Sequence, residues 1–208
     1  MRIGIDFDNT IACYRTAFHR AAAARGLVPA EPILAKNQVR DHLRRLGREH
    51  EWTELQGYVY GPGMAEVEVF PGVVNCLKGL LASGAAVFII SHRTRTPYGG
   101  PAFDLHAAAH SWLERHGFLG PARDGGTPRL LPRENVFFEL TLRDKLRRIA
   151  MQGCTHFVDD LVELLEEPEF PEGPERILFD PEEAHVGGPF HRVGSWAELQ
   201  SWLNRSNN

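Results

Sequence analysis

The sequence has few cysteines, no long apolar run and no surplus of positive charge. Its three cysteines, Cys13, Cys76 and Cys154, are odd in number and lack close-paired spacing, which suits a reducing compartment rather than a disulfide framework. No apolar run reaches the length of a transmembrane helix, and the chain opens on a strand-like segment rather than on a signal-peptide pattern. We therefore expect a cytoplasmic protein with no membrane partner.

The charge balance argues against a polynucleotide partner. The 208 residues carry a formal net charge of −4, so the chain offers no basic field for a phosphate backbone. A nucleotide as a small-molecule substrate stays open. The length is sufficient for one sizeable core with an insertion, and the sequence contains neither internal repeats nor low-complexity segments.

Two carboxylates stand at the end of the first apolar segment. Asp6 and Asp8 follow Ile3-Gly4-Ile5, and alternation along a strand sends both to the same side, with Phe7 opposite. Two such close carboxylates do not both ionise comfortably without a positive partner, and Mg²⁺ is the hard cation that oxygen ligands prefer. The alternative reading of this acidic segment is an N-cap that opens a helix.

Three further polar elements follow apolar segments in order. Ser91 closes the apolar run 86–90, Lys145 lies near the start of a helix-like stretch, and Asp159 with Asp160 closes a short strand-like run. Each has a structural alternative when taken alone: Ser91 as a turn or N-cap residue, Lys145 as a solvated helix residue, and Asp160 as the cap of the following helix.

The ordered set resembles the haloacid dehalogenase (HAD) superfamily, in its phosphatase-like form with a small helical cap inserted after the first motif. All four signature motifs are matched between positions 6 and 160, so the resemblance covers nearly the whole chain. It implies an α/β fold: a Rossmann-like, three-layer α/β/α core with a parallel sheet. The active site is then expected outside the carboxyl ends of the strands.

The resemblance assigns the chemistry residue by residue. Asp6 would attack phosphorus and form an aspartyl-phosphate, and Asp8 would act as general acid and then as general base. Mg²⁺ is the expected cofactor, held by Asp6, by the backbone carbonyl of Asp8, and by the pair Asp159 and Asp160, of which Asp159 is the expected direct ligand. Ser91 and Lys145 complete the expected catalytic set by binding the phosphoryl oxygens.

The acid at position 8 also distinguishes the phosphatases and phosphomutases of this superfamily from its dehalogenases. Dehalogenating relatives lack an acid there, because a halide leaving group needs no proton, whereas phosphatases and phosphomutases have one. Thr10 matches the phosphatase pattern and would brace the loop that carries Asp8. The expected substrate-binding residues are Thr10, Ser91, His92, Arg93 and Lys145.

A long insertion separates the first motif from the strand that ends at Ser91. Segments 16–25 and 38–48 have helical character, and proline and glycine punctuate the rest. We expect a cap at 14–69, with 1–13 and 70–208 forming the core. Cap side chains that are candidates for substrate contact, or alternatively for a solvated helix face, are Arg40, Arg44, Arg45, Trp52, Gln56, Tyr58 and Tyr60.

Other polar residues give weaker signals. Arg93 and Arg95 follow Ser91 closely, and one or the other would hold a second anionic group of the substrate, unless they are ordinary exposed loop arginines. His106 and His110 have i, i+4 spacing but lack the Glu of the zinc-protease motif, so zinc is not favoured. Glu139 closes another strand-like segment and either borders the site or is a surface acid.

The expected function is Mg²⁺-dependent hydrolysis of a small phosphate ester, such as a sugar phosphate or a nucleotide. The alternatives are a phosphotransferase or phosphomutase of the same superfamily and a catalytically silent binding protein on this fold. A phosphorelay receiver is disfavoured, because it would place the adjacent acidic pair near the start of the chain. The oligomeric state stays open, a homo-oligomer included.

Overall fold

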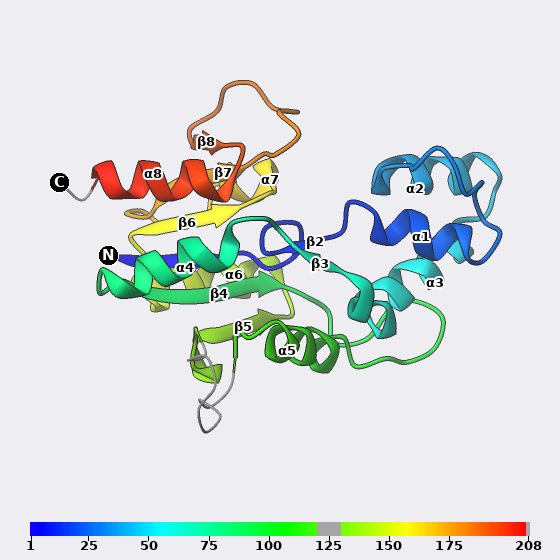
Figure 1. Cartoon of the computed structure of the whole chain (residues 1–208), viewed down its shortest axis with the longest axis horizontal. Coiled ribbons are helices and arrows are strands. Elements are labelled where there is room, and N and C mark those ends of the chain that lie inside the picture. Colours follow the sequence, from blue (N-terminus) through cyan, green and yellow to red (C-terminus); the bar gives the residue numbers. More distant parts are fainter. Residues whose placement is uncertain (120–129, 207–208) are drawn as a thin grey trace.

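A six-stranded parallel sheet forms the centre of the structure, which is a computed structural model that describes residues 1–119 and 130–206 (Figure 1). Its spatial order is β5-β4-β1-β6-β7-β8. The chain therefore builds outward on both sides of β1, and the carboxyl end of β1 lies at the switch point where such sheets bind ligands. The strands are β1 (Arg2–Ile5), β4 (Ala86–His92), β5 (Val136–Glu139), β6 (His156–Asp159), β7 (Glu175–Phe179) and β8 (His191–Val193).

The central strands are apolar on both faces because helices cover both. Ile3 and Ile5 of β1 are fully buried, as are Ile89 and Ile90 of β4, which explains why these strands read as continuous apolar runs. Three helices pack on one face: α4 (Val73–Ala82), α5 (Leu105–Arg115) and α8 (Trp196–Ser206). The other face carries α6 (Leu142–Met151) and α7 (Val162–Leu165), and the one-turn helix η2 (Arg133–Asn135) leads into β5.

This arrangement confirms the predicted three-layer α/β/α core with a parallel sheet. Within the described ranges, no helix combines the length and apolar character that crossing a membrane would need. The helix α6 illustrates the local logic. Thr141 caps it by accepting from the Asp144 amide at 3.1 Å, and Leu146 and Ile149 form its buried stripe.

A helical excursion stands beyond the carboxyl ends of the strands (Figure 1). It leaves the core through β2 (Ala12–Cys13) and returns through β3 (Glu68–Val69), which pair antiparallel. We call this excursion the cap. It contains α1 (Ala17–Ala23), α2 (Lys36–Arg45), α3 (Glu49–Tyr60) and the short helix η1 (Pro62–Glu66).

The sequence pattern predicted helices near α1 and α2 but did not single out α3. The spacing of its buried residues Trp52, Leu55 and Val59 is helical, so the signal was present. A loop of the core packs against this helix. A Cβ on Gly57 of α3 would lie 2.8 Å from the Pro97 Cβ, which shows how closely the loop between β4 and α5 approaches the cap.

We expect Gly4→Ala to destabilise the protein by about 1 to 3 kcal/mol, because overpacking a close-packed interior forces side chains off their rotamers. The new Cβ would meet the Phe157 ring at 2.6 Å and the Cys154 Sγ at 3.0 Å. Urea unfolding measures the change in the free energy of unfolding.

The matched control is Gly79→Ala in the middle of α4. Its Cβ would meet the flexible amide end of Gln200, which can move aside, and alanine favours helix. We expect this variant to be as stable as the wild type or slightly more so. Equal stability of the Gly4 and Gly79 variants would contradict the packing argument.

Candidate active site

Residues from four distant segments meet at the carboxyl ends of β1, β4 and β6. Asp6 directly follows β1, Ser91 lies near the end of β4, Asp159 ends β6, and Lys145 projects from α6. All four side chains are buried. Parallel strands end at one edge of the sheet, and this brings together residues that are far apart in sequence. The cavity at this edge has a volume of about 380 Å³ and lies between core and cap.

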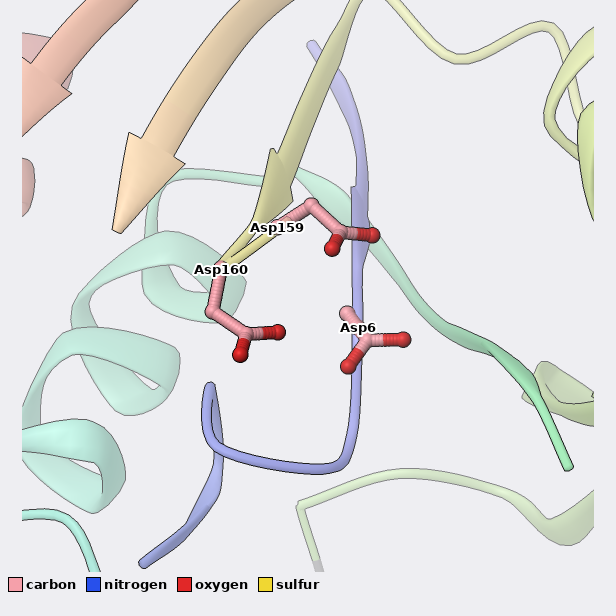
Figure 2. Close-up of side chains that lie close together, drawn as sticks. All are labelled: Asp6, Asp159 and Asp160. Atoms are coloured by element: carbon pink, nitrogen blue, oxygen red, sulfur yellow. The ribbon is translucent and has the colours of Figure 1, made fainter. Parts of the chain in front are cut away.

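Three carboxylates converge beside the cavity: Asp6 and Asp160 line its wall, and the fully buried Asp159 lies behind them. Asp6, Asp159 and Asp160 each place an oxygen so that all three atoms lie within 4.8 Å of one another (Figure 2). The Leu161 amide donates to Asp159 Oδ1 at 3.0 Å and so fixes this carboxylate. The donor set consists of oxygen alone, which fits Mg²⁺ better than a softer metal.

A single buried ammonium joins two of these carboxylates. Lys145 Nζ donates to Asp6 Oδ1 and to Asp159 Oδ2, each at 2.6 Å. Burial alone would lower the pKa of Lys145, but Asp159 and Asp6 outweigh it and the pKa is raised, so the side chain stays charged. An ammonium has three N–H groups, and the third is therefore available to a ligand.

The acidic cluster carries more negative charge than Lys145 compensates. Burial is the largest influence on Asp6 and raises its pKa from the ordinary 3.8 to about 7, against the lowering effect of Lys145. Burial, followed by the charges of Asp159 and Asp6, raises the pKa of Asp160 well above its ordinary value. A divalent cation among these carboxylates would restore their ionised forms.

Asp8 faces the same cavity, but its carboxylate belongs to a different network. Arg93 Nη1 donates to both of its oxygens at 2.7 Å, and Tyr14 Oη donates to Oδ1 at 2.6 Å. Burial, then the charge of Asp8, raises the pKa of Tyr14 well above its ordinary value, so the phenol remains a donor. The Asp8 carboxylate is thus held apart from the three acids that suit a metal.

Arg93 is buried and is not an exposed loop arginine, and its guanidinium is hydrogen-bonded to protein acceptors. Besides the bonds to Asp8, Nη2 donates to the Tyr60 carbonyl at 2.6 Å and Nε to the Leu105 carbonyl at 3.1 Å. All three nitrogens therefore have protein acceptors. The geometry makes Arg93 a residue that positions Asp8 and joins core to cap, a role that the sequence did not indicate.

Of the other residues predicted from the sequence, His92 lines the cavity, whereas Thr10, Arg95 and Glu139 do not. The ring Nε2 of His92 is 3.2 Å from the Leu140 carbonyl. Thr10 is fully buried and absent from the cavity wall, and its hydroxyl has no hydrogen-bond partner among the described residues. Arg95 is exposed and lies 3.7 Å from Asp104, while Glu139 pairs with Arg148 at 2.7 Å, outside the cavity wall.

His106 and His110, the two histidines with metal-site spacing, make contacts within the protein. His106 Nε2 is 2.7 Å from the Arg93 carbonyl, and His110 packs edge-on against Phe138 with ring centroids 5.0 Å apart. Among the residues that the structure describes, the group suited to a metal is the trio of aspartates, and it contains neither histidine.

Of the cap residues singled out from the sequence, Gln56 and Tyr60 line the cavity. Arg40 and Arg44 pair with neighbouring acids on the cap surface. The remaining three also lie outside the cavity wall: Arg45, Trp52 and Tyr58. Sequence reasoning missed Lys36, which lines the cavity from the first turn of α2; as the one lysine in segment 14–69, it had a compositional signal.

Comparison with solved structures identifies the architecture. A hydrolase of the HAD family from Deinococcus radiodurans, solved with phosphate and sodium, matches with a TM-score of 0.58 at 15% identity, over 99% of this chain and 96% of that one. The fold is that of the haloacid dehalogenase superfamily. The resemblance predicted from the four motifs is thus confirmed at the level of the fold.

Two further solved structures show the range of these neighbours. A predicted phosphatase from Clostridium acetobutylicum has a TM-score of 0.57 at 13% identity, with 98% of each chain covered. CbbY from Rhodobacter sphaeroides, in complex with xylulose-(1,5)-bisphosphate, has a TM-score of 0.54 at 16% identity, with 95% of each chain covered. No protein-family model matches the sequence, and a comparison with curated proteins finds no match.

We expect Mg²⁺ to stabilise the protein against unfolding, and more strongly at about pH 8 than at about pH 5. Without metal, the raised pKa of Asp6 means that the folded state holds a proton that the unfolded state releases between roughly pH 4 and 7. The free energy of unfolding therefore falls as pH rises through this window. Mg²⁺ favours the ionised carboxylates and offsets the loss, by about 2.7 kcal/mol at a hundred times its Kd.

Thermal unfolding with Mg²⁺ or with EDTA at the two pH values measures this effect. Asp160→Asn removes one of the three converging carboxylates, whereas Glu163→Gln removes an exposed acid on α7 and serves as the control. The first variant should lose most of the stabilisation and the second should keep it. A stabilisation that is equal in both variants would place the metal elsewhere.

Proposed function

We propose that this protein is a Mg²⁺-dependent phosphomonoester hydrolase that acts on a small phosphorylated metabolite through an aspartyl-phosphate on Asp6. The observation that carries the proposal is the geometry of the first motif. Asp6 contacts Lys145 beside the metal-suited acids, while Asp8, two residues later, is held by Arg93 and Tyr14 on the wall of the same cavity. One loop thus presents both a nucleophile and a separate acid.

In the first step, an Asp6 oxygen attacks phosphorus while the bond from phosphorus to the leaving oxygen breaks. The third N–H of Lys145 and the hydroxyl of Ser91 are placed to donate to phosphoryl oxygens. Mg²⁺ held by Asp6, Asp159 and Asp160 would neutralise the charge that otherwise repels the nucleophile from the phosphate. Phosphoryl transfer needs little beyond such positioning and charge stabilisation.

Asp8 handles the protons of both steps. In its protonated form it gives a proton to the leaving oxygen, and as a carboxylate it then accepts a proton from the water that attacks the aspartyl-phosphate. Hydrolysis of that intermediate restores the Asp6 carboxylate and releases inorganic phosphate. The bonds from Arg93 and Tyr14 leave the carboxylate few orientations, which suits an acid that must meet both a leaving group and a water.

The size of the cavity supports a small substrate. About 380 Å³ lies near the lower end of the range for small-molecule sites. We take segment 14–69 as a cap that closes over this cavity and excludes polynucleotides and phosphoproteins, with the core formed by 1–13 and 70–208. The phosphate and the sugar bisphosphate in two neighbouring structures support phosphorylated metabolites as the substrate class.

The remaining parts of the proposal follow from composition and chemistry. With three unpaired cysteines and a net charge of −4, we place the enzyme in the cytoplasm, acting on a diffusible phosphate ester and not on nucleic acid or a membrane. Transfer of the phosphoryl group to an acceptor other than water is the second candidate, because the same Asp6 and Asp8 geometry serves both reactions.

We expect Asp6→Asn to abolish phosphate release and Asp8→Asn to lower kcat by about 10²- to 10⁴-fold on an alkyl phosphate. On p-nitrophenyl phosphate, the release of nitrophenolate in the first turnover should fall much less, because nitrophenolate leaves without a proton, whereas hydrolysis of the intermediate still needs Asp8 as the base. Phosphate release and the first-turnover burst of nitrophenolate, each with Mg²⁺ and with EDTA as the blank, measure these effects. An Asp6→Asn variant with wild-type turnover would refute the aspartyl-phosphate route, and release that appears only when an acceptor sugar is added would favour the transferase.

We expect Arg93→Met to reproduce the Asp8→Asn pattern, with a larger loss of turnover on alkyl phosphates than of the first-turnover nitrophenolate burst on p-nitrophenyl phosphate. Removing the guanidinium leaves Asp8 with a weaker hold and two carbonyls unpaired, and breaking a buried ion pair costs about 3 to 5 kcal/mol of stability. The exposed Arg95→Met is the matched control and should change neither property. An equal loss in these two measurements would make Arg93 a purely structural residue.

A further inference from the structure

Lys36 of the cap stands where two cavities meet. The cavity that holds Asp6 and Lys145 and a second cavity of about 270 Å³, bordered by Phe179 and Asp180, share Asn9, Lys36 and Asp160 in their walls. A substrate whose phosphate is bound at Asp6 would therefore extend past Lys36 when it reaches into the second space.

The cap holds this ammonium in a built environment. Lys36 Nζ donates to the Tyr60 hydroxyl at 2.7 Å and lies 5.2 and 5.4 Å from the ring centroids of Phe18 and Tyr60. Burial lowers the pKa of Lys36, but Tyr60, Asp8 and Asp160 outweigh it and the pKa is raised. Burial likewise raises the pKa of Tyr60, so a charged ammonium faces a neutral phenol. The hydrogen bond to Tyr60 and the face of the Phe18 ring hold this cation in place.

Unlike its neighbours, Lys36 makes no direct ion pair among the described residues, and the carboxylates of Asp8 and Asp160 act on its charge only from a distance. Lys145 bonds two carboxylates, and Arg93 bonds Asp8 and two carbonyls. Within the described ranges, Tyr60 is the one hydrogen-bond partner of Lys36, which leaves two N–H groups for a ligand. Because no carboxylate contacts this partly buried cation directly, the site favours an anionic ligand beside it.

We propose that Lys36 binds a second anionic group of the substrate, at the end remote from the phosphate that is cleaved. The inference rests on the proposed function and narrows its substrate class to short phosphorylated acids and bisphosphates. A carboxylate and a second phosphate share the chemistry that an ammonium recognises, and the substrates below distinguish them. The alternative is a purely structural role, in which Lys36 only links α2 to α3 through its hydrogen bond to Tyr60.

The test compares substrates that differ only in the remote group. The carboxylate pairs are 6-phosphogluconate with glucitol 6-phosphate and 3-phosphoglycerate with glycerol 3-phosphate, and the phosphate pair is fructose 1,6-bisphosphate with fructose 6-phosphate. For at least one pair, the wild type should favour the doubly anionic member by about tenfold or more in kcat/KM, the size expected of a charge-assisted hydrogen bond. The doubly anionic substrate should have the lower KM, and kcat should differ little between the two members of a pair.

Four variants separate recognition from structure. Lys36→Met should lower this preference by about tenfold, and Lys36→Arg should restore most of it. Tyr60→Phe cuts the link between α2 and α3 while it keeps the cation, so it should retain the preference. Lys78→Met removes an exposed lysine on α4 and should leave the preference unchanged.

The outcomes distinguish the two proposals. Hydrolysis with equal kcat/KM for both members of every pair, or a preference that survives in Lys36→Met, would overturn the role of Lys36 and leave the hydrolase standing. If no ester releases phosphate, the hydrolase proposal fails, and titration calorimetry of the Asp6→Asn protein with the same pairs in Mg²⁺ decides about Lys36. Tighter binding of the doubly anionic member that Lys36→Met removes would support it, and equal Kd values would refute it.

Discussion

The bridge from Lys145 to Asp6 and Asp159 is the interaction on which the site depends. It joins α6 to the ends of β1 and β6, three elements that meet only when the sheet is formed. Because both carboxylates and the ammonium are buried, loss of either partner would leave a charge without compensation inside the protein. The fold therefore fixes the position of Asp6, the proposed nucleophile, through its hydrogen bond to Lys145, which keeps a third N–H group for a ligand.

Lys145 alone does not balance the acids around it. The raised pKa values of Asp6 and Asp160 show that the polypeptide by itself favours a partly protonated cluster, which would be a poor nucleophile. The protein thus stores electrostatic strain at the point where a hard cation fits. Metal binding would therefore favour the ionised form of Asp6, and the proposed activity would depend on that ionisation.

The sequence predicted the core and the chemistry of its strand ends, because both depend on local patterns. Apolar runs that end in Asp6, Ser91 and Asp159 fix the parallel strands and the edge at which they terminate. The partners of Asp8 could not be predicted in this way. Arg93 reads as a loop arginine until the packing of α5 and the cap encloses it, and its acceptors come from positions 8, 60 and 105. Lys36 stands out in the sequence only by composition, as the one lysine of segment 14–69, and it is the fold of the cap that brings it to the cavity wall.

Tyr60 connects the chemistry of the core with recognition by the cap. Its carbonyl accepts from Arg93, which orients Asp8, and its hydroxyl accepts from Lys36, which faces the far end of the cavity. A displacement of this one residue would therefore change the hold on the acid and the position of the cap ammonium together. A substrate that engages Lys36 would stabilise the arrangement in which Arg93 orients Asp8, so that binding energy from a remote group would contribute to the chemical step.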